Sequence, residues 1–275
     1  MRKTIATLSL LAGLVVASAC DHERAVASED RDTKSVTINR TWPAAQINNL
    51  RISEVDGAIS VEAGDTNEIT LVAVAKGKLD LKPEKENQGL FETVVDGDTL
   101  RIGREEKKQG RKFRIRFLWD NDRTRIQYTL KVPAKVSLDV NTVNGRIATR
   151  GIEGTTEATS VNGSIDVEVA GTHELEASTV NGRVKARFTR AFNGAKFRTV
   201  NGGVTATLPQ SASFTVDLAQ VNGDFEAAFP LSIHSHPGRR RVSGEVNGGN
   251  HELKITTVNG DVELARGNGD VDQMR

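Results

Sequence analysis

Short runs of alternating apolar and polar residues fill most of the chain, and a recurring four-residue motif separates them. The motif is Thr-Val-Asn-Gly at four places, and Ser or Gln replaces the Thr at two more. Successive copies are offset by 18, 19, 20, 21 and 37 residues. Such a repeat is typical of proteins in which similar coils stack in one direction. The six Asn-Gly pairs are Asn144-Gly145, Asn162-Gly163, Asn181-Gly182, Asn201-Gly202, Asn222-Gly223 and Asn259-Gly260.

The residues around each motif indicate strands. Mostly apolar residues stand two and four positions after each Gly, and five and seven positions before it; the first of these columns is Ile147, Ile165, Val184, Val204, Phe225 and Val262. A period of two predicts strands with one buried face. We therefore predict an all-β chain with a parallel, right-handed β-helix-like solenoid over residues 131–266, the long interval holding two coils. An antiparallel repeat sheet is the alternative, because Asn-Gly is also a hairpin signal.

The Asn-Gly pairs are predicted to be structural turns. Both residues tolerate the positive φ angles that a tight corner demands. In a stack, the six Asn side chains would lie over one another and could form a ladder of hydrogen-bonding amides. Each Asn then either fixes its own turn or belongs to a row that binds a ligand. Val246-Asn247-Gly248 is interpreted as an offset corner in a degenerate coil.

Residues 36–130 are predicted to form an irregular N-terminal β region that caps the solenoid. Residues 52–61 repeat the motif with Asp56-Gly57 in place of Asn-Gly, which predicts an early coil or a lid. A strand is expected over residues 68–75, and a hairpin across Asp96-Gly97-Asp98. Residues 113–118 are expected to pair with residues 124–132.

The first residues predict export. Positive charge and a 12-residue apolar run, Ile5 to Val16, are typical of a signal peptide over residues 1–19. Small residues then precede Cys20, the only cysteine, so the segment resembles a bacterial lipoprotein signal in which Cys20 is lipidated. Ordinary cleavage that leaves a free thiol is the alternative. We expect a flexible tether over residues 20–35, attachment to a membrane by the lipid anchor, and a disordered tail over residues 267–275.

The net charge argues against nucleic acid as a partner. The formal net charge of +1 gives no overall field that would attract nucleic acid. One segment, residues 111–119, is locally basic: on a strand, Lys112, Arg114 and Arg116 would share one face. This face is a candidate for contact with an anionic lipid or envelope polymer. It could equally protect an edge strand from self-association.

No arrangement of residues indicates catalysis or a resident cofactor. We find no nucleophile motif, phosphate loop or dinucleotide fingerprint, and expect no catalytic residues, no cofactor and no metal site. His234 and His236 could place two imidazoles on one strand face but lack further ligands at recognisable spacing. Two acidic pairs, Asp224 with Glu226 and Asp261 with Glu263, are interpreted as a solvated face rather than as glycosidase carboxylates.

With these motifs in view, the chain resembles the bacterial putative-adhesin family of unknown function. The resemblance covers roughly residues 36–266 and rests on the Thr-x-Asn-Gly coils, on the entry segment Tyr128–Pro133 and on the ending Gly244–Leu264. It implies an envelope protein with a solenoid fold, and supplies no catalytic residues to transfer.

The sequence therefore predicts a non-enzymatic lipoprotein of the bacterial cell envelope, facing the periplasm or the surface. It would act as an adhesion, scaffold or interaction module for an envelope polymer or protein. A carbohydrate-active enzyme built on a β-helix and an accessory to an envelope-stress regulatory system are the alternatives.

Overall fold

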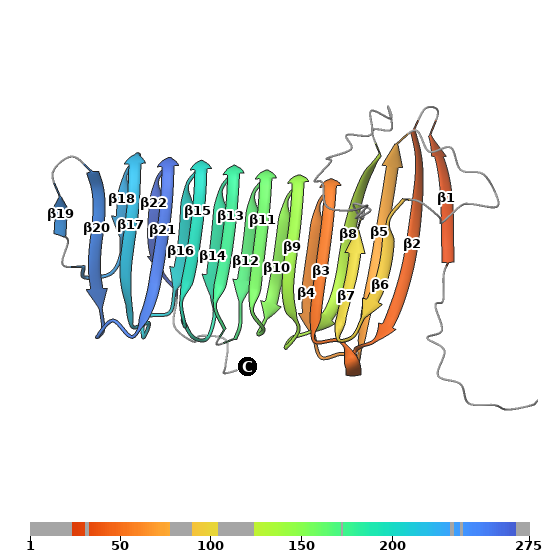
Figure 1. Cartoon of the computed structure of the whole chain (residues 1–275), viewed down its shortest axis with the longest axis horizontal. Coiled ribbons are helices and arrows are strands. Elements are labelled where there is room, and N and C mark those ends of the chain that lie inside the picture. The colour runs from red at the N-terminus through yellow and green to blue at the C-terminus, as the bar shows by residue number, and fades with distance from the viewer. Residues whose placement is uncertain are drawn as a thin grey trace, which may run out of the picture.

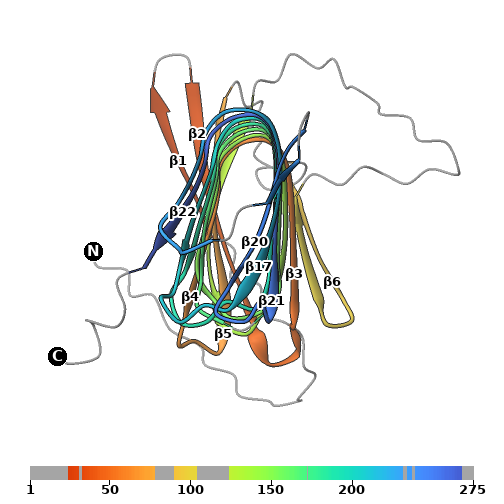
Figure 2. The same ribbon diagram turned by 90° about the vertical axis from the view of Figure 1, so that its left-hand side faces the viewer.

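The computed structural model describes residues 24–30, 33–77, 90–103, 124–171, 173–231, 234–236 and 239–267. They form two sheets of 11 strands each, which lie face to face and are joined by a row of arches (Figures 1 and 2). A single-turn helix, η1, spans Ala44–Gln46. Among the described residues there is no helix with the length and apolar character needed to cross a membrane.

Neighbouring strands in each sheet are often far apart in the chain. From one edge to the other, sheet A contains β1 (Arg24–Asp30), β2 (Thr33–Pro43), β5 (Glu68–Gly77), β8 (Arg125–Pro133), β4 (Ile59–Gly64), β10 (Ile147–Ile152), β12 (Ile165–Val169), β14 (Val184–Phe188), β16 (Val204–Leu208), β22 (Val262–Arg266) and β18 (Phe225–Ala227). Sheet B contains, in the same way, β19 (His234–His236), β20 (Arg239–Val246), β17 (Phe214–Asn222), β21 (His251–Asn259), β15 (Ala195–Asn201), β13 (Leu175–Asn181), β11 (Thr156–Asn162), β9 (Ser137–Asn144), β3 (Asn49–Asp56), β7 (Thr99–Gly103) and β6 (Glu92–Asp96).

The repeats form a parallel β-solenoid, as the sequence predicts. Each coil enters through a strand of sheet B, turns at its Asn-Gly pair and leaves through a strand of sheet A (Figure 2). Neighbouring coils place like residues side by side: Asn162 is in register with Asn181, and Ile165 with Val184. The alternative of an antiparallel repeat sheet is therefore wrong for these coils.

The predicted apolar columns form the core between the two sheets. Ile147, Ile165 and Val184 are fully buried in sheet A, and Phe197 and Leu218 in sheet B. Only the last coil of the stack departs from the pattern, because Phe225 and Ala227 are partly buried. Alternation thus predicts the direction of each side chain, and position in the stack determines how well it is covered.

The glycines at the arches are required for close packing, and the prediction that they supply positive φ is wrong at five of the six motifs. Only Gly223, at φ 130°, adopts a positive angle. At Gly145 an added Cβ would lie 1.7 Å from the carbonyl oxygen of Gly57, and at Gly182 it would lie 2.0 Å from that of Gly163. Glycine is therefore required because the arch of each coil packs against the carbonyl of the arch beside it.

The order of coils in the stack differs from their order in the chain at the C-terminal end. Strands β21 and β22 insert between the coil of β15 and β16 and the coil of β17 and β18. The prediction that the 37-residue interval holds two coils is therefore wrong. That interval contains β18 and the hairpin of β19 and β20, and β20 pairs antiparallel with β17. Val246-Asn247-Gly248 is a reversal between β20 and β21 rather than a coil corner.

The solenoid also extends into the N-terminal region. Strands β3 and β4 form a coil whose Asp56 is in register with Asn144, as the Asp-Gly copy suggests. Strands β7 and β8 pair with the far edges of β3 and β4. The predicted hairpin is present as β6 and β7, and the predicted strand over residues 68–75 is present as β5. Residues 113–118 lie outside the described residues.

Part of the predicted tether is a strand. Residues 24–30 form β1, which pairs antiparallel with β2 at the edge of sheet A. An edge strand supplies backbone partners whatever the side chains are, so a polar composition is compatible with a strand here. The signal peptide, Cys20 and residues 268–275 of the predicted tail lie outside the described residues.

Candidate interaction surface

The predicted ladder of Asn side chains runs along the arches. Each Asn donates from Nδ2 to Oδ1 of its neighbour in the stack, with donor-to-acceptor distances of 2.8 to 2.9 Å. At one end, Asn144 donates to the carboxylate of Asp56 at 2.7 Å. Because each interior amide both donates and accepts within the ladder, the arrangement favours a turn-fixing role over a row of ligand-binding amides. The order along the ladder is Asp56, Asn144, Asn162, Asn181, Asn201, Asn259 and Asn222.

The first residue of the motif ties each arch to the next. Thr179 Oγ1 donates to the carbonyl oxygen of Gly163 at 3.0 Å, and Thr199 Oγ1 to that of Gly182 at 3.3 Å. Gln220 makes the equivalent contact through Nε2 to Gly260 at 2.9 Å. Among the described residues, the buried hydroxyl of Thr142 has no hydrogen-bond partner. The first residues of the motifs therefore have a structural role, and the Thr142 hydroxyl is the exception that makes no such hydrogen bond.

The Val of each motif points outward from sheet B. The valines are 37% to 62% exposed and lie in one column beside the arches. A row of exposed apolar side chains on a monomer is a feature typical of an interaction surface. The members are Val55, Val143, Val161, Val180, Val200, Val258 and Val221.

A charged column lies on the same outer face, further from the arches. Arg51 Nε is 2.6 Å from Asp139 Oδ2, and Glu176 is 3.1 Å from both Lys196 Nζ and Arg198 Nη1. Near the edge of sheet B formed by β19 and β20, Arg241 of β20 donates two hydrogen bonds of 2.9 Å to Asp217 of β17. The hydrogen bond to Asp217, and next its negative charge, raise the pKa of Arg241.

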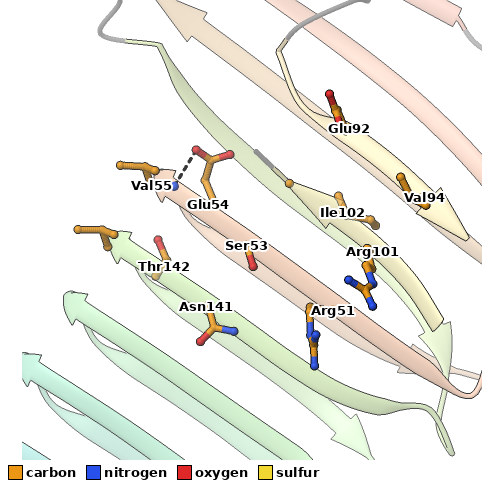
Figure 3. Close-up of a pocket in the computed structure, with 12 residues that line it drawn as sticks. Arg51, Ser53, Glu54, Val55, Glu92, Val94, Arg101, Ile102, Asn141 and Thr142 are labelled. Carbon is orange, nitrogen blue, oxygen red and sulfur yellow. Dashed lines mark hydrogen bonds between the residues drawn. The ribbon is translucent and has the colours of Figure 1, made fainter. Parts of the chain in front are cut away.

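A groove of about 410 Å³ lies on this face where β6 and β7 meet β3 and β9 (Figure 3). Strand β6 splays outward from the face and supplies one wall (Figure 2). Polar groups come from Arg51, Arg101 and Asn141, and apolar groups from Val55 and Val143. An open groove with both kinds of lining suits a flexible polymer or a protein segment better than a small apolar molecule.

Glu54 lines the groove from a fixed position. Its side chain is buried, with the residue 4% exposed, and it occupies the column that Thr, Ser or Gln fills in other coils. One carboxylate oxygen accepts hydrogen bonds from the backbone N–H groups of Val55 and Asp56, and the other accepts from the Tyr128 hydroxyl at 2.7 Å. These contacts hold the carboxylate against the core.

The hairpin that forms the groove wall is fastened to β3. Asp98 Oδ2 accepts from Asn49 Nδ2 at 3.0 Å and from Asn48 Nδ2 at 3.4 Å, and Asp98 Oδ1 accepts from Thr99 at 3.2 Å. Hydrogen bonds from Asn49, then Asn48 and Thr99, lower the pKa of Asp98. Arg101 contacts Asp96 at 3.3 Å, while its buried Nε has no hydrogen-bond partner within the described ranges.

The acidic pairs noted in the sequence meet on adjacent coils. Glu226 is in register with Glu263, and the backbone N–H of Asp224 donates to Asp261 Oδ1 at 3.0 Å. They lie on β18, β22 and the arches before them, at the far end of the stack from the groove. Over the described part of the chain, no group of three or more His, Cys, Asp or Glu side chains is arranged to hold a metal ion.

Other predicted site residues are not placed. Cys20, Lys112, Arg114 and Arg116 lie outside the described residues, and nothing is described of the side chains of His234 and His236. The groove was not predicted, because it depends on the pairing of β7 beside β3, which are far apart in the sequence. One signal was available: Glu54 replaces Thr in the single copy of the motif that carries Asp-Gly.

Comparison with solved structures gives matches of low sequence identity and low TM-score. A "putative cell adhesion protein" from Clostridium sporogenes is 10% identical, with a TM-score of 0.45 over 84% of this chain and 99% of that one. A "putative adhesin" from Bacteroides fragilis is 14% identical, with a TM-score of 0.39 over 83% and 96%. A "putative lipid binding protein" from Parabacteroides distasonis is 12% identical, with a TM-score of 0.27 over 83% and 96%. No curated protein matches the sequence.

Comparison with protein families gives a match to Toastrack DUF4097 over residues 120–265. The match covers more than half of the chain and includes all six Asn-Gly motifs, from Asn144-Gly145 to Asn259-Gly260. This chain belongs to the Toastrack DUF4097 family.

Proposed function

We propose that the protein is a non-enzymatic interaction module of the bacterial cell envelope. It would use the outer face of sheet B to bind an envelope polymer or another protein. The groove beside β3 carries this proposal, because it combines guanidinium and amide groups with exposed valines on a rigid sheet. Rigid placement lowers the entropic cost of binding.

Binding to envelope material tests the proposal. We expect the full chain to bind isolated cell-wall polymer or outer-membrane vesicles, and Arg51→Ala with Arg101→Ala to weaken binding at least 10-fold. Lys185→Ala with Arg187→Ala removes the same charge from the outer face of sheet A and should leave binding unchanged. Equal loss in both variants would contradict a role for the groove. Sugar release from any envelope polymer by the purified protein would contradict the non-enzymatic part.

Anchoring is a separate part of the proposal. The small residues before Cys20 support lipidation of that cysteine, which would hold the module at a membrane surface. Fatty-acid labelling of the full chain should be lost in Cys20→Ser. Continued labelling of that variant would contradict this anchor.

The basic segment is proposed as a second contact with the membrane. Alanine at Lys112, Arg114 and Arg116 should reduce salt-dependent binding to anionic phospholipid vesicles, since each exposed cation near such a surface contributes about 1 kcal/mol. Unchanged binding would discard this contact while leaving the groove hypothesis in place.

A further inference from the structure

The outer face of sheet B carries three parallel columns of side chains. Nearest the arches lies the column of exposed valines, from Val55 to Val221. The next column has small uncharged side chains at six of its seven positions, namely Ser53, Asn141, Thr159, Ser178, Thr256 and Ala219, with Arg198 as the exception. Over the seven strands from β3 to β17 the third column is charged at every position, and beyond them it continues to Arg101 on β7 and to Ser243 on β20. Viewed along the stack, the coils superpose, so the part of this face from β3 to β17 is flat, whereas β6 projects from it at one edge of the sheet (Figure 2).

The charged column has an unusual order. Register pairs place its members in the sequence Arg51, Asp139, Glu157, Glu176, Lys196, Lys254 and Asp217. Their charges read plus, minus, minus, minus, plus, plus, minus. Reversing this order places an opposite charge at every position except the central one, Glu176. The column is therefore complementary to its own reverse.

We propose that a second copy of this chain binds face to face on sheet B, about a two-fold axis that runs parallel to β13. This inference rests on the proposed function, and it names the partner of the same surface. The two-fold places Arg51 opposite Asp217, Asp139 opposite Lys254, and Glu157 opposite Lys196. A closed, isologous dimer follows, in which each of these pairs occurs twice.

The remaining side chains fit this arrangement. Glu176 meets its own copy at the axis, where Lys196 and Arg198 of the same chain already contact it at 3.1 Å. The valine column of one copy lies over that of the other, so both columns become buried from solvent. Seven strands at about 4.8 Å spacing give a face roughly 29 Å long. With a width of about 20 Å, the dimer would bury about 1,200 Å², the lower limit for a stable specific interface.

The outer face of sheet A lacks this complementarity. Its matching column reads Ser60, Ala148, Asp166, Lys185, Thr205, Glu263 and Glu226. Reversal of that order places Asp166 opposite Thr205 and pairs no opposite charges. Sheet A therefore provides the matched control.

Reciprocal charge reversal tests the dimer. The full chain in detergent should have the mass of a dimer by light scattering at micromolar concentration. Asp139→Lys with Glu157→Lys places like charges across the axis and should give monomer, as should Lys196→Glu with Lys254→Glu. A mixture of the two variants restores every opposite-charge pair, so tagged and untagged copies should co-purify. Circular dichroism melts establish that each variant is folded.

Two sheet A variants provide the controls. Glu62→Lys with Glu168→Lys and Lys185→Glu with Arg187→Glu make the same charge changes and should remain dimeric. A monomeric wild-type chain, or a dimer that both sheet B reversals leave intact, would overturn the proposal. If the wild-type chain is monomeric yet binds envelope polymer through Arg51 and Arg101, the proposed function survives and the dimer does not.

Discussion

The coils from β9 to β16 and the C-terminal coils from β17 to β22 make the same contacts but are reached by different chain paths. In the first region each coil packs against the next coil in the sequence. In the second, β21 and β22 insert before a coil that precedes them in the chain. The Asn ladder nevertheless passes unbroken from Asn201 to Asn259 and on to Asn222. The motif therefore specifies that two coils pack together, but not which two.

The connections decide the order. Strand β20 pairs antiparallel with one edge of β17, which leaves the other edge for β21. The reversal between β20 and β21 is fastened to the start of β17, since Ser213 Oγ donates to the carbonyl of Asn247 at 2.7 Å and accepts from the Asn250 N–H at 3.1 Å. A hairpin and one loop thus reorder a stack whose coils are otherwise interchangeable.

Pairs of introduced cysteines give the largest expected effect, because they distinguish the observed order of the coils from a stack in chain order. Adjacent strands lie about 4.8 Å apart, within disulfide range, whereas strands two apart lie at about twice that distance. In a Cys20→Ser background, Asn201→Cys with Asn259→Cys should cross-link under mild oxidation, and Asn201→Cys with Asn222→Cys should not. Mass spectrometry reads the result. Cross-linking of only the second pair would show that the coils stack in the order of the chain.

Substitutions of the arch glycines give the next largest effect. They test whether the inserted coil of β21 and β22 packs its glycine against a neighbouring carbonyl as the other coils do. Gly182→Ala and Gly260→Ala each place a Cβ 2.0 Å from a backbone carbonyl oxygen. Each should lower the free energy of unfolding by about 3 kcal/mol. Gly64→Ala, with no atom of the described residues within 4 Å of its added Cβ, should change the free energy of unfolding by less than about 0.5 kcal/mol. Denaturant melts make the comparison, and equal midpoints for all three would refute the close-packing argument.

The sequence predicts those features that depend on one coil and its neighbour. Buried columns follow from alternation, and the amide ladder follows from stacking like on like; both are present. The reason for glycine was missed, because positive φ is a property of one residue whereas the contact of Gly145 with the Gly57 carbonyl requires two coils. Local rules thus predicted the fold class and the strand positions.

Features that depend on distant pairing were beyond sequence reasoning. The inserted position of β21 requires knowing that β20 occupies the other edge of β17. The groove requires β7 beside β3, with about 50 residues of chain between paired positions such as Asn49 and Thr99. Neither pairing has a motif of its own, so alternation within each strand is compatible with several neighbours.

The Asn ladder offers a smaller effect that depends on position in the stack. Asn181 both donates to Asn162 and accepts from Asn201, whereas Asn222 donates to Asn259 at the end of the ladder. Asn181→Ala should therefore cost about 2 kcal/mol, and Asn222→Ala about 1 kcal/mol. Thermal unfolding of the two variants measures the ratio. A larger loss for Asn222→Ala would show that the terminal coil depends on its Asn for more than the ladder.

The smallest effect distinguishes two hydroxyls that the motif treats as equivalent. Thr179 donates to the carbonyl of Gly163, so Thr179→Val should cost about 1 kcal/mol by leaving that acceptor without its partner. Thr142 is equally buried, yet its hydroxyl finds no hydrogen-bond partner in the part of the chain that the structure describes. Thr142→Val should therefore be neutral or stabilising, because it removes an unsatisfied polar atom and keeps the shape of the side chain. Chemical denaturation of the Thr179→Val and Thr142→Val variants measures the difference between the two hydroxyls. A loss in Thr142→Val as large as that in Thr179→Val would mean that the Thr142 hydroxyl is hydrogen-bonded as well, and that β9, which packs against the N-terminal coil of β3 and β4, follows the same rule as the interior coils.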